Sequence, residues 1–260
     1  MNQYTYDHDD EKAMGSYYNG FFKGFHIFMN PHEYGDVLAL KFGMPRHCAE
    51  LALCKEHIMT LLHQKKYKEA WEMLNRTLMI GNALGPRILQ MNKFIGWAYL
   101  TDSCVDAIVS IRAMYGNPTI HEFGAGLGFN AAMMRAAGIK VVAEDSIVDA
   151  KNCFTYVKKN PNITILPTEI FFICWGHPDD RLTIESVIDT YIKTGGQCCI
   201  VLGEDMYGST YPYVRNRLKP HGENSIMERK GLKLHTRMPA RYYFTSTVIT
   251  TWMEIYHVKA

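Results

Sequence analysis

The stretch Ile120–Gly128 (IHEFGAGLG) constrains the fold more strongly than any other part of the chain. An apolar run ends there in an acid, Glu122. Three glycines follow at every second position: Gly124, Gly126 and Gly128. The next run, Phe129–Ala137 (FNAAMMRAA), has a helix-like composition. Glycine accepts positive φ and lets a ligand approach the backbone closely. A strand, a glycine-rich turn and a helix in this order therefore predict a pocket of nucleotide size.

The spacing of the glycines distinguishes a dinucleotide-binding motif from a SAM-binding motif. A dinucleotide fingerprint, G-x-G-x-x-G, would place its last glycine at position 129, which is Phe129 here. The pattern E-x-G-x-G-x-G instead resembles motif I of the class I S-adenosylmethionine (SAM) methyltransferases. That resemblance implies SAM as the cofactor. Two alternatives stay open: a nicotinamide or other nucleotide, and a tight βαβ turn without a ligand.

A second acidic position follows the motif. The run Ile139–Ala143 (IKVVA) reads as a strand and ends in Glu144 and Asp145. In such folds an acid at the end of the second strand, roughly 20 residues after the glycine motif, hydrogen-bonds a ribose diol. We expect Asp145 in this role because it shares strand parity with Val141 and Ala143, and Glu144 is the alternative.

The chain alternates between strands and helices from residue 119 onward. Strands are predicted near 119–123, 139–144, 163–166, 169–175, 197–203, 226–235 and 244–257. Helices are predicted near 128–137, 147–159, 180–194 and 210–218, and a further helix at 103–114 precedes the motif. This alternation predicts an α/β fold: a mostly parallel seven-stranded sheet with helices on both faces, closed by an antiparallel pair.

Residues 1–92 are expected to form a helical N-terminal extension, and 93–260 the ligand-binding domain. Two helix-like segments, 46–64 and 67–80, predict a helical hairpin. Before them, aromatic residues recur at helical spacing: Tyr17, Phe21, Phe25 and Phe28. This aromatic segment is expected to pack on the main domain, to cover the substrate pocket, or to contact a second copy or a partner protein.

The composition of the chain indicates its cellular compartment and limits the classes of partner it is expected to bind. A net charge of +2 is too small to indicate nucleic-acid binding, although RNA is not ruled out as a substrate. The seven cysteines are odd in number and lack C-x-x-C spacing, as is typical of reduced intracellular thiols. The sequence shows no signal-peptide pattern and no membrane-spanning run, and His47, Cys48, Cys54 and His57 lack zinc spacing. We therefore expect a cytoplasmic protein without a metal or a membrane partner.

Candidate catalytic residues follow the strand predicted at 169–175. Trp175 would stack on adenine or on a substrate ring. His177 would take a proton from an acceptor, and Asp179 is a second candidate base. In the alternative, structural interpretation, Trp175 fills the core and Asp179 caps a helix. The next strand ends in Glu204 and Asp205, which would bind a cationic or hydroxylated substrate or lie in a solvated loop.

A narrower resemblance covers roughly residues 95–205. The E-x-G-A-G-x-G loop, a V-x-A-x-D-like strand, a C-W-P-P-like turn and a G-E pair are similar to a family of uncharacterised SAM-dependent methyltransferase-like proteins. This resemblance implies that Glu122, Gly124, Gly126 and Asp145 bind SAM. The full predicted cofactor set adds Ala125, Gly128, Glu144 and Trp175.

The sequence departs from the family pattern at two places. Phe129-Asn130 replaces an aromatic pair, and Trp175-Gly176-His177-Pro178 replaces Trp-Pro-Pro. The resemblance implies a Rossmann-like class I methyltransferase acting on RNA, protein or a small molecule. The alternative is a catalytically inactive methyltransferase-like fold that acts as a binding or assembly subunit.

Overall fold

The structure is a computed structural model, and it describes residues 46–83, 96, 98–174, 181–204, 225–242 and 251–258. The predicted helix at 210–218 and the aromatic segment Tyr17–Phe28 lie outside these residues. None of the described helices is both long and apolar enough to cross a membrane. Among the described residues, Cys54, Cys104, Cys153, Cys174, Cys198 and Cys199 are free thiols.

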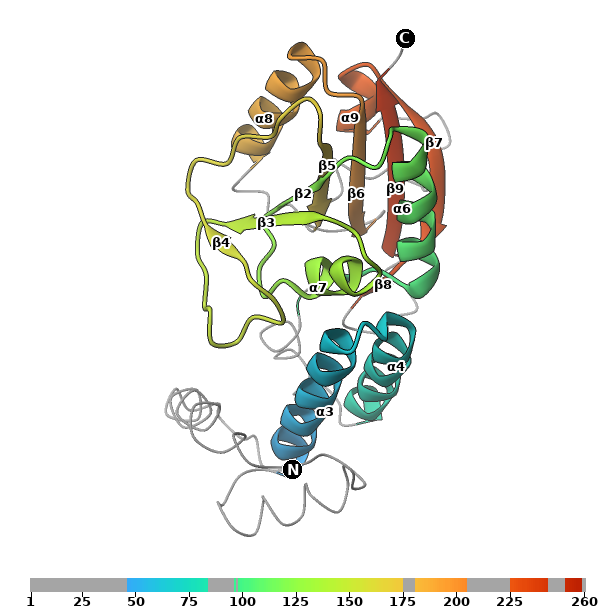
Figure 1. Cartoon of the computed structure of the whole chain (residues 1–260), viewed down its shortest axis with the longest axis vertical. Helices are drawn as coiled ribbons and strands as arrows, with labels where there is room; N and C mark the ends of the chain where they lie inside the picture. The colour runs from blue at the N-terminus through green and yellow to red at the C-terminus, as the bar shows by residue number, and fades with distance from the viewer. Residues whose placement is uncertain are drawn as a thin grey trace, which may run out of the picture.

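A seven-stranded sheet forms the centre of the molecule (Figure 1), in the order β4-β3-β2-β5-β6-β9-β7. Its strands are β2 (Ile120–Phe123), β3 (Val141–Asp145), β4 (Lys158–Lys159), β5 (Ile170–Cys174), β6 (Cys198–Glu204), β7 (Leu232–Pro239) and β9 (Thr251–Val258). The five neighbouring strands β4, β3, β2, β5 and β6 pair in parallel. Strand β9 runs antiparallel to both β6 and β7. This confirms the predicted mostly parallel seven-stranded sheet with a closing antiparallel pair.

Helices cover both faces of the sheet because its central strands are apolar on both sides. In β5, Ile170 and Phe172 belong to the core shared with α6 (Asp102–Met114) and α7 (Phe129–Ala136). Phe171 and Ile173 face the opposite way. They belong to the core under α8 (Arg181–Lys193) and α9 (Ile226–Arg229). The alternation of side chains along each strand thus builds two separate cores.

A helical hairpin precedes the sheet, as predicted. It consists of α3 (Arg46–His63) and α4 (Tyr67–Ala83), which lie side by side next to α7 (Figure 1). Ile58, Trp71 and Leu74 are buried in the same core as α6 and α7. The hairpin therefore packs into the main core. A short two-stranded sheet, β1 (Ala98–Tyr99) with β8 (Arg241–Tyr242), follows it.

The predicted helix at 147–159 is wrong. This segment consists of turns, bends and irregular backbone, and its last two residues are strand β4. Asp145 Oδ1 accepts the N–H of Ile147, and Asp149 accepts from the backbone N–H of Lys151 and the side chain of Asn152. These local side-chain acceptors compete with helical hydrogen bonding.

Two predicted strands also need correction. Residues 163–166 form no strand, and β4 takes the sheet edge instead. Within the predicted strand 226–235, residues 226–229 form helix α9, and β7 begins at Leu232. Ser225 and Glu228 form a capping box, which starts the helix. The spacing Ser-x-x-Glu was the missed signal.

Candidate functional site

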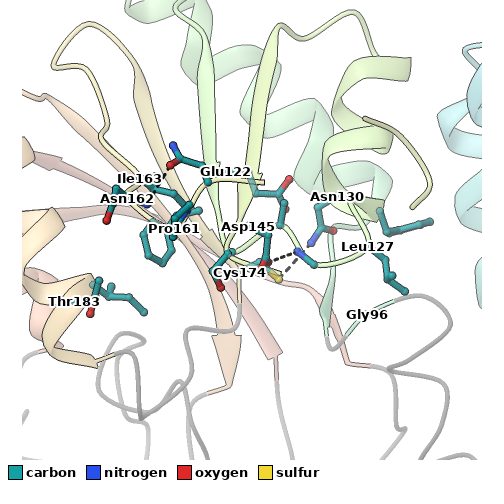
Figure 2. Close-up of a pocket in the computed structure, with 18 of the residues that line it drawn as sticks. Gly96, Glu122, Leu127, Asn130, Asp145, Pro161, Asn162, Ile163, Cys174 and Thr183 are labelled. Carbon is teal, nitrogen blue, oxygen red and sulfur yellow. Dashed lines mark hydrogen bonds between the residues drawn. The ribbon is translucent and has the colours of Figure 1, made fainter. Parts of the chain in front are cut away.

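A cavity of about 660 Å³ opens beyond the carboxyl ends of β2, β3 and β5. Ligands bind at this edge of open α/β sheets, and the volume is typical of small-molecule sites. Four parts of the chain form its wall (Figure 2): the glycine loop with Glu122, the end of β3, the segment 160–164, and the start of α8. Gly96, Ala98, Asn130 and Cys174 complete the wall.

The glycine loop has the backbone that its sequence predicts. Gly126 has φ 54°, and a Cβ there would meet no atom within 4 Å, so the conformation alone favours glycine. Gly128 has φ 72° and caps α7, and a Cβ there would lie 2.7 Å from Val157 Cγ2. Gly124, Ala125 and Gly126 line the cavity. Gly128 is not among the lining residues.

Four backbone N–H groups of this loop already have acceptors in the protein. Gly124 and Ala125 donate to the carbonyl oxygen of Glu144, Gly126 donates to Asp145 Oδ2, and Gly128 donates to the carbonyl oxygen of Ala125. A pyrophosphate site uses free loop N–H groups to hold the anion. These four donors therefore do not form a phosphate cradle.

Glu122 lies in the cavity wall and is only 1% exposed. Its Oε2 has no hydrogen-bond partner among the described residues. Burial raises the pKa of this carboxyl from 4.5 to about 8, although the charge of Arg135 opposes the shift. A buried acceptor without a donor is costly, so this atom points to a ligand that supplies one.

Asp145 lines the same cavity from the end of β3. Its Oδ2 accepts from Gly126 N at 2.8 Å, and its Oδ1 accepts from Ile147 N at 2.9 Å. Each carboxylate oxygen has two lone pairs, so both can accept a further hydrogen bond. Asp145 is therefore fixed in place and still able to bind a ligand donor.

Glu144, the alternative ribose ligand in the sequence analysis, lies outside the cavity wall. Its carboxylate is buried and accepts from Lys158 Nζ at 2.7 Å and Asn160 Nδ2 at 3.1 Å, with His121 Nε2 at 3.0 Å. Burial alone would raise the pKa of Glu144, but these hydrogen bonds outweigh it and lower the pKa. The geometry gives Glu144 a structural role, linking β3 to its neighbours.

Asn130 is a site residue that sequence reasoning treated only as the loss of an aromatic ring. Its Oδ1 accepts from Leu100 N at 3.0 Å, and its Nδ2 donates to the Ala98 carbonyl at 3.2 Å and to Cys174 Sγ at 3.3 Å. It thus ties α7, the segment 98–100 and the end of β5 together beside the cavity. An amide among the apolar residues of FNAAMM was the available signal. Phe129 is buried against Tyr99 and Phe154.

The segment 160–164 and the start of α8 were also missed. Asn160, Asn162, Ile163 and Thr183 line the cavity opposite the glycine loop. Because a strand was predicted at 163–166, this part of the cavity wall was not identified. The run Asn160-Pro161-Asn162 indicates a turn and was the available signal.

Trp175, His177 and Asp179, the predicted catalytic residues, lie outside the described residues, as does Asp205. Glu204 is the last residue of β6. Within the described ranges, no cluster of three or more His, Cys, Asp or Glu side chains could hold a metal ion.

Solved structures of similar fold exist, although no protein-family model and no curated protein sequence matches this chain. A protein from Listeria monocytogenes assigned to the class I SAM-dependent methyltransferases has a TM-score of 0.45 and 10% identity, covering 88% of this chain and 86% of that one. The 1,6-didemethyltoxoflavin-N1-methyltransferase of Burkholderia thailandensis, with bound S-adenosylhomocysteine, has a TM-score of 0.41 and 12% identity, covering 91% and 94%. The magnesium protoporphyrin IX methyltransferase of Synechocystis, with bound SAM, has a TM-score of 0.38 and 10% identity, covering 60% and 79%.

The strand order assigns the fold class. Five parallel strands are followed by β9, an antiparallel strand inserted between β6 and β7. With helices on both faces and the cavity at the carboxyl ends of the parallel strands, this is a Rossmann-like α/β fold.

Proposed function

We propose that this protein is a SAM-dependent methyltransferase and that the cavity binds SAM. The observation that carries the proposal is the buried, unpartnered Oε2 of Glu122 in the same wall as Asp145. SAM presents a cationic ammonium group and a ribose diol, which are both hydrogen-bond donors. Two carboxylates in one cavity match that pair: Glu122 for the ammonium and Asp145 for the diol.

The remaining wall suits an adenine ring. Ile163 and Ile184 offer apolar surface, and Asn162 and Thr183 offer amide and hydroxyl groups for the edge of the base. The glycine loop supports the same choice because four of its N–H groups, at Gly124, Ala125, Gly126 and Gly128, are satisfied internally. A nicotinamide dinucleotide would need those groups for its pyrophosphate, so that alternative is disfavoured.

Bound SAM would supply an electrophilic methyl group on sulfonium, and transfer is a direct displacement. The task of the chain is then to align the acceptor and to exclude water. Asn130 holds the segment 98–100 against the cavity. Glu122 and Asp145 would hold the ammonium group and the ribose of the cofactor. We further propose that His177 takes the proton when the acceptor is a nitrogen or an oxygen.

Calorimetric titration tests the proposal. We expect S-adenosylhomocysteine and SAM to bind the wild-type protein at micromolar strength, with no heat from NAD. Asp145→Ala should abolish binding while leaving the fold intact by circular dichroism. Binding of NAD but not of the adenosyl ligands would refute the cofactor assignment. Binding without turnover of RNA, protein or small-molecule acceptors would favour the inactive, binding-subunit alternative.

A further inference from the structure

Lys55 of α3 is a buried lysine that contacts the cofactor-binding half of the molecule. Its side chain is 3% exposed, which is rare for lysine. Nζ donates to the carbonyl oxygen of Asn152 at 2.7 Å and lies 4.7 Å from the ring centroid of Phe154. Lys55 thus joins the N-terminal hairpin to a segment 97 residues further along the chain.

The segment that Lys55 contacts supports the glycine loop directly. The N–H of Phe154 donates to the carbonyl oxygen of Leu127 at 2.8 Å. The thiol of Cys153 donates to the carbonyl oxygen of Asp149 at 3.2 Å, and its sulfur also lies 3.9 Å from the carbonyl oxygen of Gly126. The ring of Phe154 packs edge-on against Phe129, the first residue of α7, at 5.2 Å between centroids. Contacts therefore run from Lys55 through 152–154 to Gly126 and Leu127, which line the cavity.

The ammonium group is not needed to fill this space. Burial lowers the pKa of Lys55 to about 8, although the negative charges of Glu56 and Asp149 oppose the shift. An apolar side chain of the same length would cover Phe154 without that desolvation cost. A charged donor kept where an apolar chain would suffice indicates a task of orientation, since it fixes the Asn152 carbonyl.

We propose that Lys55 is a positioning residue for the Gly126–Leu127 turn, which makes the α3–α4 hairpin part of the cofactor site. The hairpin lies beside α7 (Figure 1), and Lys55 of α3 donates to the carbonyl oxygen of Asn152. The inference rests on the proposed function, because the ligand positioned by the turn is the adenosyl cofactor.

The test compares Lys55→Met with Lys66→Met. Methionine keeps an unbranched chain but removes the ammonium donor. Lys66 is a matched control because it is exposed and paired with Glu69 at the turn between α3 and α4. Two readouts are needed: the Kd for S-adenosylhomocysteine, and amide hydrogen exchange at Phe154 and Gly128 without ligand. Melting temperature is followed to confirm folding.

We expect Lys55→Met to weaken S-adenosylhomocysteine binding roughly tenfold, because binding must then also order the Gly126–Leu127 turn. Exchange at Phe154 and Gly128 should accelerate while the melting temperature is kept, and Lys66→Met should change neither readout. Unchanged affinity and exchange in Lys55→Met would overturn the inference. If the wild-type protein itself binds no adenosyl ligand, the proposed function fails, and exchange alone then decides whether Lys55 orders the turn.

Discussion

Replacing Glu122 by glutamine is expected to stabilise the protein and to remove the proposed SAM binding. The unfolded carboxyl has a pKa of 4.5 and the folded one about 8, so between these values the folded state holds a proton that the unfolded state has lost. Stability therefore falls as pH rises through this window. At about 1.4 kcal/mol per pKa unit, the loss reaches roughly 3 kcal/mol at pH 7 and roughly 5 kcal/mol above pH 8.

Glutamine cannot ionise, so Glu122→Gln escapes this loss. We expect up to about 3 kcal/mol of added stability at pH 7, a melting temperature higher by roughly 6–12 °C, and little difference at pH 5. The assay is urea unfolding of both proteins at pH 5, 7 and 8.5, with calorimetric titration of SAM on the same samples. If the variant is less stable than the wild type at every pH, the conclusion that the Glu122 carboxyl is buried without a donor is refuted. A variant that binds SAM normally would refute its pairing with the ammonium group.

Three further predictions follow from the same geometry. Because the raised pKa keeps Glu122 protonated at pH 7, binding of the cationic ammonium of SAM should release close to one proton. Calorimetric titration in buffers of different ionisation enthalpy measures this release, and a binding enthalpy that is the same in every buffer would contradict the prediction. Gly128→Ala should destabilise by about 2–4 kcal/mol in urea unfolding, because its Cβ would meet Val157 at 2.7 Å and φ is positive; a change below 1 kcal/mol contradicts it. Asn130→Ala should cost about 2–3 kcal/mol and weaken SAM binding, since it leaves the Leu100 N–H without its partner; unchanged affinity would separate this residue from the site.

The parts of the fold that were predicted correctly are those that local sequence specifies. The central strands are continuous apolar runs, and the glycine loop needs positive φ at fixed positions. Parity along β3 was enough to favour Asp145 over Glu144, and the structure places only Asp145 in the cavity wall. These features depend on a few adjacent residues, so a single sequence is enough to find them.

The errors fall where contacts distant in sequence decide the structure. Apolar residues in 147–159 have helical spacing, but Phe154 donates to Leu127 and Asp145 caps Ile147. The edge strand β4 is only two residues long, and it is held by pairing with β3. The role of Lys55 depends on a partner 97 residues away. No local pattern reports such contacts, so the loop, the edge strand and the second wall of the cavity could not be predicted.

Glu122 and Glu144 show how the surroundings of two similar acids separate binding from structure. They lie on adjacent strands and are 1% and 3% exposed. Glu144 receives hydrogen bonds from lysine and asparagine, so its pKa falls and its charge stabilises the fold. Glu122 has an orphan oxygen, so its pKa rises and its charge destabilises the fold until a ligand supplies a donor.

Glu144→Gln is therefore the matched control for Glu122→Gln, with the opposite sign. It should lower the free energy of unfolding by about 1–3 kcal/mol at pH 7, because the buried carboxylate at Glu144 loses the charge that strengthens its hydrogen bonds. This stabilising contribution in the wild-type protein is present above pH 4.5 and is lost as pH falls through the lowered pKa. Urea unfolding of the two variants at pH 7 provides the comparison. Changes of the same sign would mean that burial, rather than the presence or absence of donors, determines how each carboxyl affects stability. The assignment of Glu122 as a cofactor ligand would then be refuted.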